Sequence, residues 1–160
     1  MIRIYTPLTQ VDTKTPTYKV GSRTEIVGGN EYIYLPGTTT LGQYDWVTII
    51  TSSALSYGSV TRLPAAGTSG VGLVGISQGT PAMTGNTFGW FQIKGIGWGN
   101  AGSAVASGSP VFSSGTAGLV QTLYRGTSAI LNAFGFGTGV SGGTAKFIIN
   151  YPFACGQDMT

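Results

Sequence analysis

Short runs of β-branched and aromatic residues, separated by Gly, Pro, Ser and Asn, dominate the hydrophobic pattern of this 160-residue chain. Runs of this kind are typical of β-strands, and no long segment repeats apolar residues at helical spacing between capping residues. The pattern predicts less than about a tenth of the chain in helix. The predicted strands are Glu31–Leu35, Asp45–Thr51, Val71–Ser77, Phe88–Lys94, Gly118–Tyr124, Ile130–Phe136 and Ala145–Tyr151, with weaker signals at Ser59–Leu63, Ala104–Ala106 and Pro110–Phe112.

The spacing of these strands predicts an all-β protein. Strands that recur every 8–15 residues or so, with turns throughout, favour a compact sandwich or barrel of the β-tulip or jelly-roll-like kind. We therefore expect a single β domain over residues 31–160. Pro36-Gly37 suits a type II turn. Phe88–Lys94 breaks strict alternation, so this strand is either covered on both faces or bulged at Gly89.

Residues 1–30 have a different pattern. Pro7 and Pro16 interrupt any strand signal, and the segment ends at Gly28-Gly29. This predicts an extended N-terminal arm over residues 1–30 that contacts another subunit, anchored by its apolar residues. The alternative is an irregular first strand with loops inside the same domain.

The composition predicts a folded chain with a charge-poor surface. Charged residues make up 8% of the sequence, against a usual share of about 25%. Disorder normally needs the opposite combination, low hydrophobicity with high charge. A surface with so little charge is poorly protected against association, so we expect neighbouring subunits to cover much of it.

The chain lacks the side chains that most catalytic sites need. It contains no histidine, and no Asp or Glu occurs between Asp45 and Asp158. General acid–base catalysis and metal sites draw on these residues, so we expect no enzymatic activity, no cofactor and no metal. Matches to GxGxxG, as at Gly70–Gly75, lack a following helix and an acidic partner. The GxSxG match at Gly139–Gly143 lacks a base.

The remaining ionisable residues point to protein partners. Arg62, Lys94, Arg125 and Lys146 are isolated in sequence, which disfavours nucleic acid and fits a steering role towards a large acidic surface. Cys155, the single cysteine, is expected to be a small buried residue rather than half of an internal disulfide. No run of apolar residues approaches membrane-spanning length.

Four segments of the chain resemble head-decoration (cement) proteins of tailed bacteriophages. The shared plan consists of a G-x-E-Y/F-x-Y strand, a G-x-x-V strand, a V-G-x-A/S strand and a G-W-x-Q-I-x-G strand. In this chain these strands correspond to Gly29–Gly37, Gly42–Val47, Val71–Ser77 and Phe88–Gly95. The resemblance covers roughly residues 28–95 and extends more weakly to about residue 124.

The resemblance implies a capsid-bound structural protein made in the host cytoplasm. Its partners would be the major capsid protein and further copies of itself, as a homotrimer, and it would stabilise the expanded shell. The alternative is a carbohydrate- or receptor-binding module of a head fibre or tail. The residues expected at the capsid or subunit contact are Ile2, Arg3, Ile4, Tyr5, Leu8, Lys14, Lys19, Arg23 and Trp98.

Overall fold

A computed structural model describes residues 8–51, 57–65, 72–79, 83–85, 87–122, 129–137 and 143–155. This described part holds eleven strands and no helix, which confirms the all-β prediction. The strands are β1 (Asp12–Thr13), β2 (Arg23–Ile26), β3 (Asn30–Gly37), β4 (Trp46–Thr51), β5 (Tyr57–Arg62), β6 (Gly72–Ser77), β7 (Thr87–Asn100), β8 (Pro110–Ser113), β9 (Val120–Gln121), β10 (Ala129–Gly135) and β11 (Thr144–Ala154).

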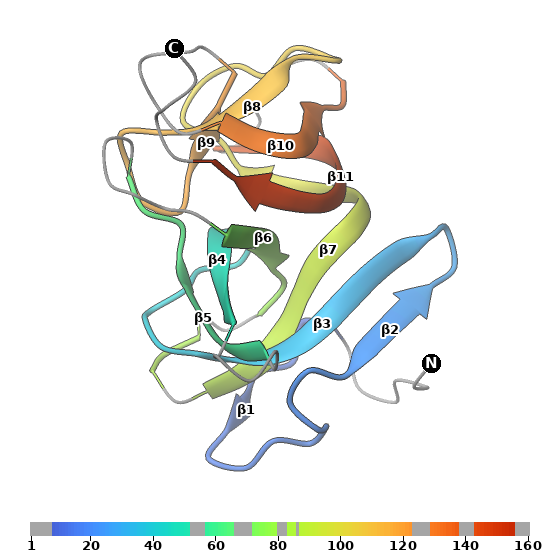
Figure 1. The fold of residues 1–160 in the computed structure, drawn as a ribbon, viewed down its shortest axis with the longest axis vertical. Helices are drawn as coiled ribbons and strands as arrows, with labels where there is room; N and C mark the ends of the chain where they lie inside the picture. The colour runs from blue at the N-terminus through green and yellow to red at the C-terminus, as the bar shows by residue number, and fades with distance from the viewer. Residues whose placement is uncertain are drawn as a thin grey trace.

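The strands close into two small barrels that share β7 (Figure 1). The first barrel runs β3–β5–β4–β6–β7 and returns to β3. The second runs β7–β11–β10–β8–β9, and a bridge between Ala101 and Val120 closes it. Closure leaves few free sheet edges, which is one way in which β proteins avoid unwanted pairing.

Each barrel has its own apolar core. Ile33, Leu35, Val47, Ile49 and Phe91 are among the buried residues of the first barrel. The second core is built around Trp46 and Phe147, whose rings meet edge to face with centroids 5.0 Å apart. Trp46 belongs to β4 of the first barrel, while its neighbour Val47 faces the first core. The strand β4 is therefore buried on both faces, and the two barrels form one body.

Alternating glycines allow β7 to serve both barrels. Gly95, Gly97 and Gly99 alternate with the exposed side chains of Ile96 and Trp98. A Cβ at Gly99 would lie 2.7 Å from Trp46 Nε1, and one at Gly95 would lie 1.9 Å from Asn30 Oδ1. Since real Cβ contacts are longer than this, the missing side chains make room for the neighbouring residues.

The N-terminal segment packs on its own chain, so residues 8–30 follow the alternative of strands and loops inside the same domain and not that of an extended arm. β1 pairs with β7, and β2 pairs with β3 along its whole length. The Tyr18 ring packs edge to face on Trp90 at 5.2 Å and on Tyr34 at 5.5 Å. This contact covers the outer face of β3 and β7, which carries too many aromatic side chains to be left exposed. The contacts of residues 1–7 lie outside the described residues.

The structure also tests three local predictions, for Pro36-Gly37, for Phe88–Lys94 and for Ala104–Ala106. Pro36 and Gly37 pair with Phe88 and Thr87 inside β3, so the predicted turn there is wrong, because pairing with β7 outweighs local turn preference. Trp90 and Phe91 are buried on opposite faces of β7, as in the first of the two alternatives given for this strand. Ala104–Ala106 does not form a strand.

Candidate interaction surface

The outer side of the second barrel exposes a row of large apolar side chains. Phe134 on β10 lies opposite Ile148 on β11, which lies opposite Ile96 on β7. Directly opposed residues of antiparallel strands share a face of the sheet. Phe136 and Trp98 flank this row. We call these five residues the outer apolar face, and each of them is between 40% and 46% exposed.

A single cation lies on this face. Lys146 is opposite Trp98, and its Nζ sits 5.1 Å from the centre of the Trp98 ring. A cation over an indole is attracted by the ring electrons. Since no Asp or Glu occurs between Asp45 and Asp158, no carboxylate of the second barrel can pair with Lys146.

The apolar surface continues past an irregularity in β10 and β11. The register shifts between Leu131 and Ala133, and Asn132 and Tyr151 have positive φ values of 58° and 50°. The extra residues in β11 turn Tyr151 and Phe153 outward, next to exposed Leu131. Bulges often re-aim side chains in this way beside functional sites.

The hairpin formed by β2 and β3 projects beyond the barrels (Figure 1). We call residues 23–31 the finger. Its tip turns through Gly28 and Gly29, whose φ values of +100° and +79° suit glycine, and Gly29 N donates to Ile26 O. Ile26 is 38% exposed and Val27 is fully exposed. The tip therefore presents two apolar side chains to solvent.

Polar contacts fasten the finger to the second barrel. Lys94 Nζ donates to Glu31 Oε1 at 2.7 Å, and Tyr151 OH donates to Glu31 Oε2 at 2.5 Å. Ile96 N donates to Asn30 Oδ1 at 2.8 Å. The hydrogen bond from Lys94 holds the pKa of Glu31 below its ordinary value, and Glu31 in turn raises the pKa of Lys94 and of Tyr151.

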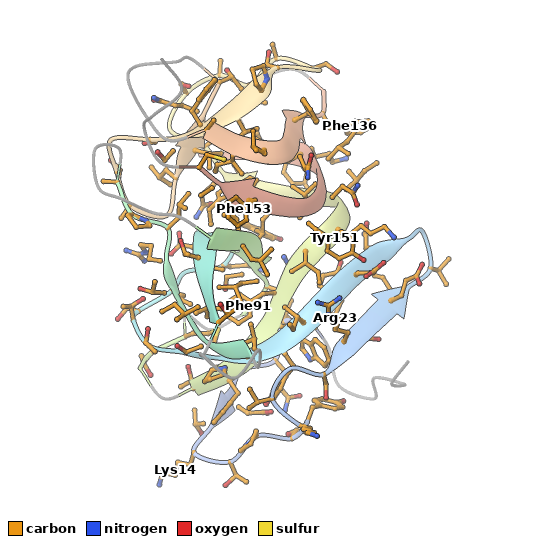
Figure 2. All side chains as sticks on the ribbon, in the orientation of Figure 1. Lys14, Arg23, Phe91, Phe136, Tyr151 and Phe153 are labelled. Carbon is orange, nitrogen blue, oxygen red and sulfur yellow. The ribbon has the colours of Figure 1, made fainter. Side chains whose placement is uncertain are left out.

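A small cavity lies where the finger meets the mouth of the first barrel. Ile33, Ile49 and Leu73 line it together with Arg23 and Tyr151, two side chains that Figure 2 labels. Its volume of about 20 Å³ admits little more than a water molecule. An open hollow beside it is lined by Arg23, Thr24, Glu25 and Glu31.

The structure distributes the predicted contact residues over separate places. Leu8 packs on the Tyr32, Tyr34 and Trp90 cluster, and Lys14 and Lys19 are exposed on the segment after β1. Arg23 lies at the base of the finger, and Trp98 belongs to the outer apolar face. Figure 2 places Lys14 and Phe136 at opposite ends of the long axis. The predicted residues Ile2, Arg3, Ile4 and Tyr5 lie outside the described residues.

Two of the four cations expected to steer the chain are already paired. Arg62 Nη2 lies 2.7 Å from Asp45 Oδ2, and Asp45 also accepts from Asn100 Nδ2 at 2.8 Å. Lys94 is bound to Glu31. Their charges are therefore largely neutralised within the chain, and of these four positions only Lys146 stays as an unpaired cation in the described part. Arg125 lies outside it.

The residues that sequence reasoning missed are mainly Phe134, Phe136, Ile148 and the finger tip. In Lys146–Ile149 nearly every residue is apolar, so periodicity could not separate exposed Ile148 from buried Phe147. The signal that could have helped was the tip sequence Ile26-Val27-Gly28-Gly29, in which two apolar residues precede a glycine turn.

The described residues define an all-β protein with an exposed apolar face. They contain no cluster of three His, Cys, Asp or Glu side chains that could hold a metal ion. Cys155 is half-buried, so it is less enclosed than expected. Nor do they contain a helix long and apolar enough to cross a membrane. Comparisons with protein-family models, with curated proteins and with solved structures found no match for this chain.

Proposed function

We propose that this chain is a structural virion protein that decorates and stabilises the capsid of a tailed phage. It binds the outer surface of the major capsid protein lattice and has no enzymatic role. The observation that carries the proposal is a closed and charge-poor β body with an exposed apolar face at one end and exposed lysines at the other. The resemblance to decoration proteins supports it, because the segments that resemble them supply strands β3, β4, β6 and β7 of the first barrel.

An exposed apolar surface like the outer apolar face is typical of proteins that bind other subunits. Large contiguous apolar patches on soluble proteins mark interaction sites. Interface cores are enriched in aromatic residues and depleted in charge, as this face is. Burying one large apolar side chain contributes about 1.5–3 kcal/mol. Few ions need to lose water when such a surface is covered, which lowers the cost of a broad contact.

We assign the shell contact to the N-terminal region, at the opposite end of the molecule from Phe136. Lys14 and Lys19 are exposed there, and no salt bridge to either occurs within the described residues. Exposed cations steer a protein towards an acidic surface and raise its rate of association. Residues 1–7 would extend this contact, with Ile2, Ile4 and Tyr5 as apolar anchors. Further copies of the chain, as a homotrimer, would cover other surfaces.

Binding to the assembled shell would stabilise it by mass action. A protein that binds the lattice and not the separated subunits contributes RT ln(1 + [L]/Kd) at each site. At a free concentration of about a hundred times Kd this is roughly 2.7 kcal/mol per site. Repeated over the lattice, this makes the shell more resistant to heat and to chaotropic agents.

The test uses expanded shells that lack decoration. The purified chain is added, the shells are sedimented, and the bound fraction and the disruption temperature are measured. The proposal expects saturable binding and a higher disruption temperature. Lys14→Glu together with Lys19→Glu should slow binding by about tenfold or more at low salt. The matched control, Lys146→Glu, should leave the binding rate of the single chain unchanged. Shells that take up no protein and disrupt at the same temperature would contradict the proposal.

One observation favours a second function, a carbohydrate- or receptor-binding module of a head fibre or tail. Trp98, Tyr151 and Phe153 are exposed aromatic side chains of the second barrel, with Asn132 and Asn150 exposed near them. Aromatic rings with neighbouring polar groups provide an apolar surface and hydrogen bonds together. Binding of the wild-type chain and of the Trp98→Ala variant to a glycan array tests this alternative. Glycan binding lost in the variant would favour it over decoration.

A further inference from the structure

Four of the five acidic side chains of this chain lie within residues 1–45, and this divides the surface by charge. Two of the five acidic residues, Glu25 and Glu31, lie on the finger. The second barrel, which follows Asp45 and precedes Asp158, has none. Among its described residues it carries Lys94, which is paired with Glu31, and Lys146, which is not paired with an acid. The finger carries two carboxylates and one cation, Arg23, so it is weakly acidic, and the outer apolar face carries the cation Lys146.

The finger carries a carboxylate, Glu25, that Lys94 attracts only at longer range and that forms no salt bridge within the described residues. Glu25 and Glu31 are directly opposite each other in the β2–β3 pair. Like charges in this position destabilise a strand pair. Lys94 and Tyr151 satisfy Glu31. The Glu25 carboxylate is exposed, and no hydrogen bond or salt bridge to it is found in the described part of the chain.

The finger is also held in a fixed position. Next to its turn, Asn30 and Glu31 tie it to β7 and β11. Its turn is fixed by Gly28, Gly29 and the bond from Gly29 N to Ile26 O. A preorganised element loses little conformational freedom on binding, which favours association. The apolar tip, Ile26 and Val27, therefore reaches solvent on a rigid support.

Within one chain the tip and the face do not cover each other. Val27 is fully exposed, and the side chains of the outer apolar face keep at least 40% of their surface in contact with solvent. The same chain thus carries an acidic, apolar projection and a basic, apolar surface, both uncovered. The two surfaces are neighbours on the chain, since Asn30 beside the tip accepts a hydrogen bond from Ile96 N, and a second copy can cover both.

We propose that the partner of the outer apolar face is the finger of a second copy of this chain. In this contact Ile26 and Val27 of one copy pack on Phe134 and Ile148 of the next. The Glu25 carboxylate of the first copy pairs with Lys146 of the second. The apolar contact supplies most of the affinity, and the charge pair sets the orientation. This contact deepens the self-association part of the proposed function, and because it needs no shell, its test can fail while shell binding holds.

A charge exchange between the two surfaces tests the contact. The mass of the purified chain is measured by sedimentation over a range of concentrations. The wild type should assemble beyond the single chain. Glu25→Lys and Lys146→Glu should each weaken assembly by about tenfold or more, because each puts like charges together. The double variant should recover most of the loss. Val27→Asp should weaken assembly by at least as much, since it places a carboxylate in the apolar contact.

Two controls make the outcome unambiguous. Lys14→Glu changes the net charge as Lys146→Glu does but lies at the other end of the molecule, and it should assemble like the wild type. Circular dichroism should show the same fold in every variant, because all four positions are exposed. A wild type that stays a single chain up to about 100 μM, well above the roughly micromolar range of specific interfaces, would overturn the proposal. So would a double variant no better than its singles.

Discussion

Tyr151, near the end of the last strand, donates a hydrogen bond to the carboxylate of Glu31, 120 residues earlier in the chain. Lys94 of the shared strand β7 donates to the other oxygen of the same carboxylate. One side chain thus joins the finger, the first barrel and the second barrel. This contact helps to fix the direction in which the finger projects, because it ties Glu31 to both β7 and β11.

Removing the tyrosine hydroxyl should loosen the finger. We expect Tyr151→Phe to lower the free energy of unfolding by about 0.5–1 kcal/mol, the net value of one hydrogen bond reduced for its exposure to solvent. Amide hydrogen exchange over residues 23–31 should become faster, since this hydrogen bond holds Glu31 near the turn of the finger. The amides of β4, at the centre of the body, serve as the internal control and should be unaffected. An unchanged finger would show that the contacts of Lys94 and Asn30 hold it without the tyrosine hydroxyl.

The contribution of Glu31 should depend on pH in a defined direction. Its pKa in the folded protein lies below its ordinary value of 4.5. The stabilisation is therefore fully present above pH 4.5 and is lost as the pH falls through the lowered pKa. We expect Glu31→Gln to be less stable than the wild type at pH 7, with the difference shrinking below pH 4.5. Urea unfolding of both proteins across this range measures it, and a difference that does not change with pH would contradict the assignment.

The glycines of β7 should be intolerant of even a methyl group. A Cβ at Gly99 would meet Trp46 Nε1 at 2.7 Å and Phe147 Cδ2 at 3.1 Å. We expect Gly99→Ala to lower the free energy of unfolding by about 1–3 kcal/mol through overpacking. Gly115→Ala is the matched control, because a Cβ there meets nothing within 4 Å. It should change stability by less than about 0.5 kcal/mol. Equal effects at both positions would show that the Trp46 contact is not tight.

Two deletions should distinguish the proposed shell-binding role of residues 1–7 from the packing of residues 8–22 on β3 and β7. Removing residues 1–7 should leave the fold intact and weaken shell binding. Removing residues 1–22 also strips β1 and the Tyr18 ring from Tyr34 and Trp90. We expect this second variant to lose several kcal/mol, at about 1.5–3 kcal/mol for each large side chain exposed. Tryptophan fluorescence during unfolding measures the loss. A stable protein without residues 1–22 would mean that the cover is dispensable.

Much of the strand pattern could be predicted because it depends on local composition. The predicted strand Asp45–Thr51 and the strand β4 differ by one residue, and Ile130–Phe136 matches β10 closely. The strand β1 was missed because it is only two residues long. The strand β2 was missed because Arg23–Ile26 is short and polar on one side. Its strand conformation comes from pairing with β3, a non-local contact that composition does not encode.

The candidate site was predictable only in part, for a related reason. Trp98 was expected at a contact and lies on the outer apolar face. Phe134 and Ile148 were not expected at a contact, because their exposure depends on which side of β10 and β11 faces the second core. That choice is fixed by register, and a shift of one residue would reverse it. The pairing of Arg62 with Asp45 was also hidden, since 17 residues of sequence separate the two.

The number of copies in a virion tests the proposed function most directly. A decoration protein occupies sites repeated over the whole lattice, whereas a fibre or tail module occupies a vertex or the tail. Quantitative gel densitometry of purified virions, with the major capsid protein as the internal standard, gives the ratio of the two chains. The account predicts hundreds of copies of this chain in each virion. A dozen copies or fewer would contradict it.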